Sequence, residues 1–356
     1  MTARPFDGKR LLVTGGTGSL GKLLVRRLLT GEMGTPERVV VFSRDEAKQH
    51  QMRLEYLNKA ASTDEVVFSN FQRQLAFRIG DVRDFNSVSA ALHDADVVFS
   101  AAALKQVPTC EYFPWEAVQT NIGGAENVVR AIEQLKIPIE LVVGVSTDKA
   151  CKPVNVMGMS KAIQERIYIQ ANMRAPRTRF VCVRYGNVLA SRGSVIPLFH
   201  DQIKNGGPVT ITTEDMTRFL LSLNESVDLI FAAVGGALPG ETYVPKVPSS
   251  RMVDVAAALI GDRDIRTEVV GIRPGEKVHE ILVSDEEAAR TVRRGDYYVI
   301  QPMLPELEAA TGEPIVLTSE YSSADGVQSV EATETLLRER KLMLEDLARD
   351  EDEVLR

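Results

Sequence analysis

Leu11-Leu12-Val13-Thr14-Gly15-Gly16-Thr17-Gly18-Ser19-Leu20-Gly21 is the stretch that decides the fold of this 356-residue chain. A short apolar run precedes a glycine-rich turn, and leucines then recur at positions 20, 24 and 28, the spacing of a helix that faces a sheet. A glycine triplet alone can be only a turn, but its place between a strand and a helix favours a dinucleotide site, where backbone and helix N–H groups bind the pyrophosphate. The expected cofactor-binding residues here are Thr14, Gly15, Thr17, Gly18, Ser19, Leu20 and Gly21.

Short apolar runs alternate with helical patterns through the first half of the chain, as in βαβ units. The expected strands are residues 11–14, 38–43, 75–80, 96–101, 141–146 and 180–188. This order predicts an α/β fold with a doubly wound parallel sheet of the Rossmann type. We expect residues 1–190 to form the dinucleotide-binding domain, with later segments able to return to it. Residues 191–335, with shorter strands and more turns, should mainly form a smaller α/β substrate-binding domain, and residues 336–356 a charged tail with a surface helix.

Composition excludes several functions. The formal net charge of -7 disfavours nucleic acid and anionic membrane surfaces as partners. The three cysteines lie far apart without a CxxC pair, and the four histidines are scattered, so we expect neither a disulfide framework nor a metal site. No apolar stretch approaches the ~20 residues of a membrane span. A cytoplasmic protein fits these features best.

The ends of the next three strands supply further cofactor candidates. The second strand ends in Ser43-Arg44, where an NAD enzyme usually carries an acidic residue, and an arginine can instead pair with the 2′-phosphate of NADP. Arg44 and Lys48 could also be solvated surface charges. After the third strand, Asp81 beside Val82 either reaches the adenine or caps the following helix. Small residues after the fourth strand, Ala101 and Ala102, would admit the cofactor.

A catalytic pattern follows the fifth strand. Thr147-Asp148-Lys149 precedes Met157-Gly158-Met159-Ser160-Lys161, which resembles the short-chain dehydrogenase order of a hydroxyl residue and then a YxxxK helix. Met157 stands where the tyrosine belongs. Positions 157 and 161 share one helix face, so Lys161 can still reach the nicotinamide ribose. A thioether cannot accept a hydroxyl proton, and the substitute base could be Asp148, Lys161 or a water held by Thr147.

Eleven ordered segments extend the resemblance across nearly the whole chain: TGGTGSLG, SRDEAKQ, GDVRD, AAALKQVP, TNIGG, STDKA, RYGNV, SRGSV, MTRF, RPGEK and EYSS. Together they resemble the UDP-N-acetylglucosamine 4,6-dehydratases of the inverting, soluble type, which are extended short-chain dehydrogenases. The resemblance implies an NADP-dependent lyase that makes a 4-keto-6-deoxy sugar nucleotide with inversion at C5 for surface glycans. It also implies a homo-oligomer. The stretch 58–74 is longer than the link usual in that family.

The same resemblance assigns roles to residues. Asp148 would be the acid that expels the C6 hydroxyl, and Lys149 the base at C5, which favours inversion. Burial, Lys161 and a positive nicotinamide ring would lower the pKa of Lys149 from about 10.4. An ordinary Asp–Lys pair on a loop is the alternative. The expected substrate-binding residues are Lys105, Asn121, Arg184, Asn187, Arg192, Ser194, Pro197, Arg218, Arg273 and Glu276.

Some of these substrate-binding candidates could instead have purely structural roles. Asn121 could only hold the backbone, any one arginine could be a surface charge, and His279 beside Glu280 is expected to be structural. At the level of the whole protein, the alternatives are a sugar-nucleotide epimerase, an enzyme that releases a 5,6-unsaturated sugar, and an NADP-binding scaffold made inactive by Met157.

Overall fold

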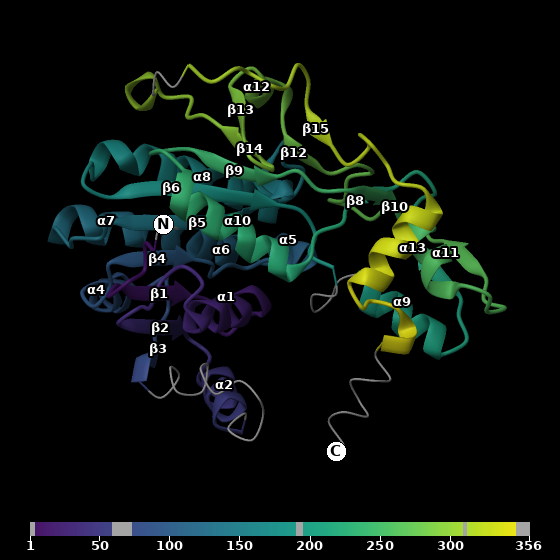
Figure 1. The fold of residues 1–356 in the computed structure, drawn as a ribbon, viewed down its shortest axis with the longest axis horizontal. Helices are drawn as coiled ribbons and strands as arrows, with labels where there is room; N and C mark the ends of the chain where they lie inside the picture. Colours follow the sequence, from purple (N-terminus) through teal and green to yellow (C-terminus); the bar gives the residue numbers. More distant parts are fainter. Residues whose placement is uncertain (1–3, 59–72, 190–194, 309–311, 347–356) are drawn as a thin grey trace.

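A nine-stranded sheet forms the centre of the computed structural model, which describes residues 4–58, 73–189, 195–308 and 312–346 (Figure 1). The strand order is β13-β14-β9-β6-β5-β4-β1-β2-β3. Pairing is parallel from β9 to β3, whereas β14 and β13 are antiparallel. The strands are β1 (Arg10–Thr14), β2 (Arg38–Ser43), β3 (Leu75–Ile79), β4 (Val97–Ser100), β5 (Leu141–Thr147), β6 (Arg179–Tyr185), β9 (Thr242–Pro245), β13 (Thr291–Arg294) and β14 (Tyr297–Ile300).

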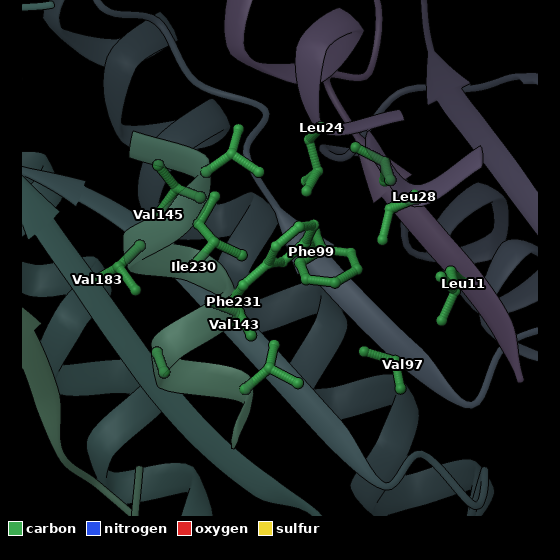
Figure 2. Close-up of a cluster of buried hydrophobic side chains, with 14 of the residues drawn as sticks. Leu11, Leu24, Leu28, Val97, Phe99, Val143, Val145, Val183, Ile230 and Phe231 are labelled. Atoms are coloured by element: carbon green, nitrogen blue, oxygen red, sulfur yellow. The ribbon is translucent and has the colours of Figure 1, made fainter. Parts of the chain in front are cut away.

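Helices cover both faces of this sheet. Side chains of one face pack with α1 (Ser19–Thr30), α2 (Glu46–Asn58) and α10 (Leu223–Gly236), and side chains of the other face pack with α4 (Phe85–Leu92), α7 (Gly124–Leu135) and α8 (Val156–Arg174). Figure 2 shows the first core, where Phe99 of β4 lies between Leu24 of α1 and Ile230 and Phe231 of α10. Alternation along each strand divides the apolar residues between the two cores. The predicted doubly wound fold is confirmed.

A smaller unit lies beside the carboxyl ends of the central strands (Figure 1). Its own apolar core is formed by side chains such as Phe199, Leu220 and Leu259. Two short strand pairs, β10–β8 and β12–β15, lie near it, and β12 contacts the short 3-10 turn that follows β5. The elements are α9 (Val195–Lys204), β7 (Val209–Ile211), β8 (Thr217–Phe219), β10 (Ser249–Arg251), α11 (Met252–Ile260), β11 (Thr267–Val269), β12 (Ile281–Val283), β15 (Tyr321–Ser322) and α13 (Val330–Glu339).

The six predicted strands lie where expected to within one residue at each end, except at the end of β6. Strand β6 ends at Tyr185 rather than at residue 188, because the chain then leaves the sheet and the Leu189 N–H donates to the Leu221 carbonyl in the smaller unit. Strands β9, β13 and β14, from the later half, return to the main sheet. The division near residue 190 therefore does not separate two sheets.

The expectation of a surface tail from residue 336 is wrong at its start. Helix α13 begins at Val330 and includes Leu337, and both Leu337 and Met343 are buried in the core of the smaller unit. The apolar spacing inside a charged segment places these side chains inward. Residues 347–356 and the long link 59–72 lie outside the described residues. Within the described part of the chain, no helix is long and apolar enough to cross a membrane.

Candidate active site

The glycine turn joins the ends of β1 and β4. Gly15 has φ of +68°, and a Cβ there would lie 2.8 Å from the Ala102 Cα, so only glycine fits without strain. The Thr14 hydroxyl oxygen accepts hydrogen bonds from the N–H groups of Ala101 (3.1 Å) and Ala102 (3.2 Å). Four predicted cofactor residues from two strands are thus brought together at one edge of the sheet.

Helix α1 begins at the same turn. Its N-cap residue is Gly18, and no side chain caps the helix, so backbone N–H groups at Ser19 and Leu20 remain for an anion. A Cβ on Gly21 would lie 2.5 Å from the Gly16 Cα, which shows how closely helix and turn pack. These features fit a dinucleotide pyrophosphate.

The adenosine side of the site is formed by the ends of β2 and β3. The hydroxyls of Thr17 and Ser43 lie 3.0 Å apart and connect the turn to β2. Arg44 is exposed, and its Nη1 is 3.8 Å from the Asp81 carboxylate. Burial raises the pKa of Asp81, but the hydrogen bonds that Arg83 donates to its carboxylate, together with nearby positive charge, outweigh burial, so the pKa is lowered.

Other candidates near this end have different contacts. Asp84, not Asp81, caps α4 through the N–H groups of Asn86 and Ser87, so the capping alternative for Asp81 is wrong. Lys48 pairs with Asp45 at 2.8 Å on the surface. Val82 is buried against Gly124. Among these candidates, Arg44 is exposed directly after β2.

The reactive pair predicted from sequence lies directly after β5, in the short 3-10 turn Asp148–Ala150. Lys149 Nζ donates to Asp148 Oδ1 at 3.1 Å and to Asn187 Oδ1 at 2.8 Å. The Thr147 hydroxyl donates to the same Asp148 oxygen at 2.9 Å. Asp148 is 1% exposed. The turn therefore concentrates an acid, an amine and a hydroxyl in a few ångströms.

Glu280 completes this cluster, although the sequence motifs did not indicate it. It precedes β12, is 2% exposed, and its Oε1 lies 3.1 Å from Lys149 Nζ. Arg218 of β8 has its Nε 3.9 Å from the same oxygen. The available signal was a carboxylate four residues after Glu276, next to an apolar strand. Among the residues that the structure describes, neither Asp148 Oδ2 nor Glu280 Oε2 has a hydrogen-bond partner.

The expected low pKa of Lys149 is wrong for this structure. Burial lowers the pKa of Lys149, but the charges of Asp148 and Glu280 raise it by more than burial lowers it, so the net shift is upward. The two carboxyls respond in opposite directions. Burial raises the pKa of Asp148, whereas for Glu280 the pull of Lys149 and Arg218 exceeds burial, and the pKa is lowered.

Helix α8 presents the two positions of the modified YxxxK motif. Lys161 is buried and its Nζ donates to the Val145 carbonyl and to Gln164 Oε1, both at 2.5 Å. Burial lowers the pKa of Lys161 to about 8. Met157 is 5% exposed and packs with Cys110 and Ala117 in a small apolar cluster. The thioether at the tyrosine position is thus a packing group.

Three predicted substrate residues are engaged within the protein. Arg184 is 3% exposed and forms bidentate pairs with Glu165 and Glu287, so the expectation that it binds the substrate is wrong. Asn121 bonds both backbone groups of Leu104, as its structural alternative required. Arg218 donates to the carbonyls of residues 217, 277 and 278. It therefore lies near Lys149 and Glu280, but its Nη groups are not free to bind a phosphate.

The remaining substrate candidates are more open. Lys105 and Arg273 are exposed, and Pro197 is half-buried in α9. Glu276 Oε2 is buried without a hydrogen-bond partner among the described residues. His279 bonds the Thr217 hydroxyl at 2.8 Å, a structural contact. Arg192 and Ser194 lie outside the described residues.

The sheet, the glycine turn and the cluster after β5 define a dinucleotide-binding fold of the extended short-chain dehydrogenase class. Residues 11–302 match the family described as "Polysaccharide biosynthesis protein", and the chain belongs to this family. A relative from Rickettsia conorii, named UDP-glucose 4-epimerase, is 47% identical over 300 residues, 83% of this chain and 83% of the relative.

Solved structures agree on the fold. The X-ray structure of Pen from Bacillus thuringiensis is 33% identical, with a TM-score of 0.83 over 95% of this chain and 99% of that chain. DesIV, a dTDP-glucose 4,6-dehydratase from Streptomyces venezuelae with NAD and TYD bound, is 21% identical, with a TM-score of 0.61 over 76% of this chain and 86% of that chain. At that identity the second likeness concerns the fold alone.

Proposed function

We propose that this protein is an NADP-dependent, C5-inverting UDP-N-acetylglucosamine 4,6-dehydratase. The observation that carries the proposal is the pairing of half-buried Lys149 with buried Asp148 at the carboxyl end of a central strand, where doubly wound folds bind their ligands. A lysine and a carboxyl side by side supply both the base and the acid that elimination of water requires. Homology to the Rickettsia conorii protein supports a UDP-sugar as the substrate class.

The residues divide the elimination between them. Lys149 removes the C5 proton, which is acidic once C4 is a ketone, while Asp148 gives a proton to the C6 hydroxyl so that the C6–O bond breaks and water leaves. Thr147 donates to Asp148 Oδ1 and orients it. A proton then adds to C5 from the other face. When bound, the nicotinamide supplies the redox chemistry by taking a hydride from C4 and returning it to C6, so the net redox change is nil.

The C4 hydroxyl proton needs a base other than Met157. Of the three candidates, Lys161 gains support because its pKa of about 8 leaves part of the population neutral near pH 7 to 8. Asp148 is used in the elimination, and a water held by Thr147 remains the third option. Lys161→Met should therefore slow the first oxidation more than the C5 proton exchange of a supplied 4-keto compound.

The preference for NADP rests on Arg44. Its guanidinium is exposed beside Asp81 at the end of β2, where a 2′-phosphate would lie. A charge-assisted contact of about 1.5–3 kcal/mol corresponds to a preference of roughly ten- to hundredfold. Titration of Arg44→Ala with NADP and NAD tests this, and an unchanged preference would remove the argument.

A second candidate function is 4-epimerisation of a UDP-sugar, favoured by the name of the Rickettsia conorii relative. Epimerisation shares the oxidation at C4 but needs neither a C5 base nor a C6 acid. The two are separated by NMR of the product of UDP-N-acetylglucosamine in heavy water. A dehydratase yields a C6 methyl group and deuterium at C5, an epimerase changes only C4, a vinylic C6 signal indicates the 5,6-unsaturated product, and no product at all indicates a scaffold.

A further inference from the structure

Lys149 lies between two buried carboxylates from different parts of the chain. Asp148 is its neighbour in sequence, whereas Glu280 comes from the segment before β12, and each places one oxygen 3.1 Å from Lys149 Nζ. The Asn187 side-chain carbonyl is a third acceptor at 2.8 Å. These three acceptors match the three N–H donors of an ammonium group.

We propose that Glu280 is a positioning residue that acts through Lys149. It holds the Nζ group at the end of β5 and stabilises the positive charge that Lys149 acquires when it takes the C5 proton. This inference rests on the proposed function and deepens it, because it assigns the counter-ion of the base.

The surroundings of Glu280 support this role. Its backbone is fixed by Ser323, whose hydroxyl accepts from the Glu280 N–H at 2.9 Å and whose own N–H donates to the Glu280 carbonyl at 2.8 Å. Arg218, a second cation nearby, directs its Nη groups to backbone carbonyls, and its Nε is 3.9 Å from Glu280 Oε1. Lys149 is therefore the closer ionic partner, and a carboxylate on a fixed backbone orients it.

The two carboxyls suit different tasks. The pKa of Asp148 is raised, first by burial and also by Glu280, while the pKa of Glu280 is lowered by Lys149, Arg218 and Lys277 despite burial. Neighbouring acids whose pKa values are pushed apart take separate roles, one as acid and one as anion. The raised pKa of Asp148 suits donation of a proton to the leaving hydroxyl, and the lowered pKa of Glu280 makes it the more persistent anion beside Lys149.

The first test measures the lysine itself and needs no turnover. Acetic anhydride at trace level is applied to wild type and Glu280→Gln over a range of pH, and acetylation of Lys149 is measured by peptide mass spectrometry. An opposite charge at this range shifts a pKa by roughly 1–3 units. We expect the labelling midpoint of Lys149 in E280Q to move down by about one unit or more, because the anion that raises the pKa of Lys149 is gone.

Two controls accompany this labelling. Lys152, which pairs with Asp285 and Glu320, should keep its midpoint in the same samples. Asp254→Asn removes a buried, ion-paired carboxylate in α11 and should leave the Lys149 midpoint unchanged. An unmoved midpoint in E280Q would overturn the proposal. Glu280→Asp, which keeps the charge, should show a smaller shift and covers the case in which E280Q does not fold.

The second test measures C5 exchange in heavy water against pH. The exchange rate in wild type should rise with pH as Lys149 becomes neutral. In E280Q this rise should occur at lower pH, and the plateau rate should fall about tenfold. A purely structural role would lower the rate without changing the pH at which it rises. Wild type that makes no 4-keto product would refute the proposed function, whereas a shifted labelling midpoint would still support Glu280 as the partner of Lys149.

Discussion

Two clusters of buried charge lie on neighbouring strands of this protein, and they are built for different purposes. On β6, Arg184 is held by Glu165 and Glu287, each through two hydrogen bonds, and also donates to the Leu282 carbonyl. At the end of β5, Lys149 also meets two carboxyls, but one oxygen of each lacks a hydrogen-bond partner among the described residues.

The two clusters differ in whether hydrogen bonds satisfy all of their buried charged groups. A buried ion is tolerated when hydrogen bonds satisfy it, and the Arg184 cluster meets this condition. The Lys149 cluster leaves lone pairs unsatisfied, which is unfavourable for stability and suits a site that must bind and move protons. Stability and reactivity should therefore respond separately to changes in the two clusters.

The largest expected effect comes from Lys149→Met. The change removes the proposed C5 base, and the rate of C5 exchange should fall about 10²- to 10⁴-fold. Heavy-water NMR of the product measures it. Arg184→Met serves as the matched control, since the same substitution in the other cluster should leave the pH dependence of the remaining activity unchanged. A normal exchange rate in K149M would dismiss the assigned role.

Arg184→Met should act mainly on stability. Removing one partner of a buried ion pair leaves uncompensated charge on Glu165 and Glu287, and about 3–5 kcal/mol of unfolding free energy should be lost. Urea unfolding followed by circular dichroism measures this loss. If R184M instead kept its stability and raised KM for the sugar nucleotide, Arg184 would be the substrate ligand that the sequence suggested.

The two clusters should also respond to pH with opposite sign. Burial alone would raise the pKa of Glu287, but Arg184 lowers it to about 2, so this carboxylate stabilises the fold above about pH 5 and the effect is lost as pH falls toward 2. At ~1.4 kcal/mol per unit, Glu287 contributes about 3 kcal/mol to this acid loss. A pH series of urea midpoints should show a shallower acid slope in Glu287→Gln than in wild type.

Asp148 should give the opposite pH dependence of stability. Because its pKa is raised in the folded protein, its contribution favours the fold at low pH and is lost as pH rises through the folded pKa. Asp148→Asn should therefore have a higher Tm than wild type near pH 8 and a diminishing advantage below pH 4. A lower Tm in D148N at pH 8 would contradict the raised pKa.

The contrast also explains which features the sequence could predict. The glycine turn and the Asp148–Lys149 pair are contiguous in sequence, so strand, turn and helix patterns placed them correctly. The partners of Arg184 and Lys149 depend on tertiary structure, since Glu287 lies 103 residues after Arg184 and Glu280 comes from a different strand pair. A motif containing an arginine cannot show whether that arginine faces a ligand or a buried carboxylate, and Arg184 was misassigned for this reason.

The smallest expected effect concerns Met157, where the sequence pattern raised the question of a missing acid. Its side chain packs with Cys110 and Ala117 in a small apolar cluster. Met157→Leu nearly conserves volume, so it should cost less than about 1.5 kcal/mol of stability and change kcat by less than tenfold. Thermal unfolding and initial rates measure the two effects. A large loss of kcat at unchanged Tm would mean that the thioether contributes to the chemistry after all.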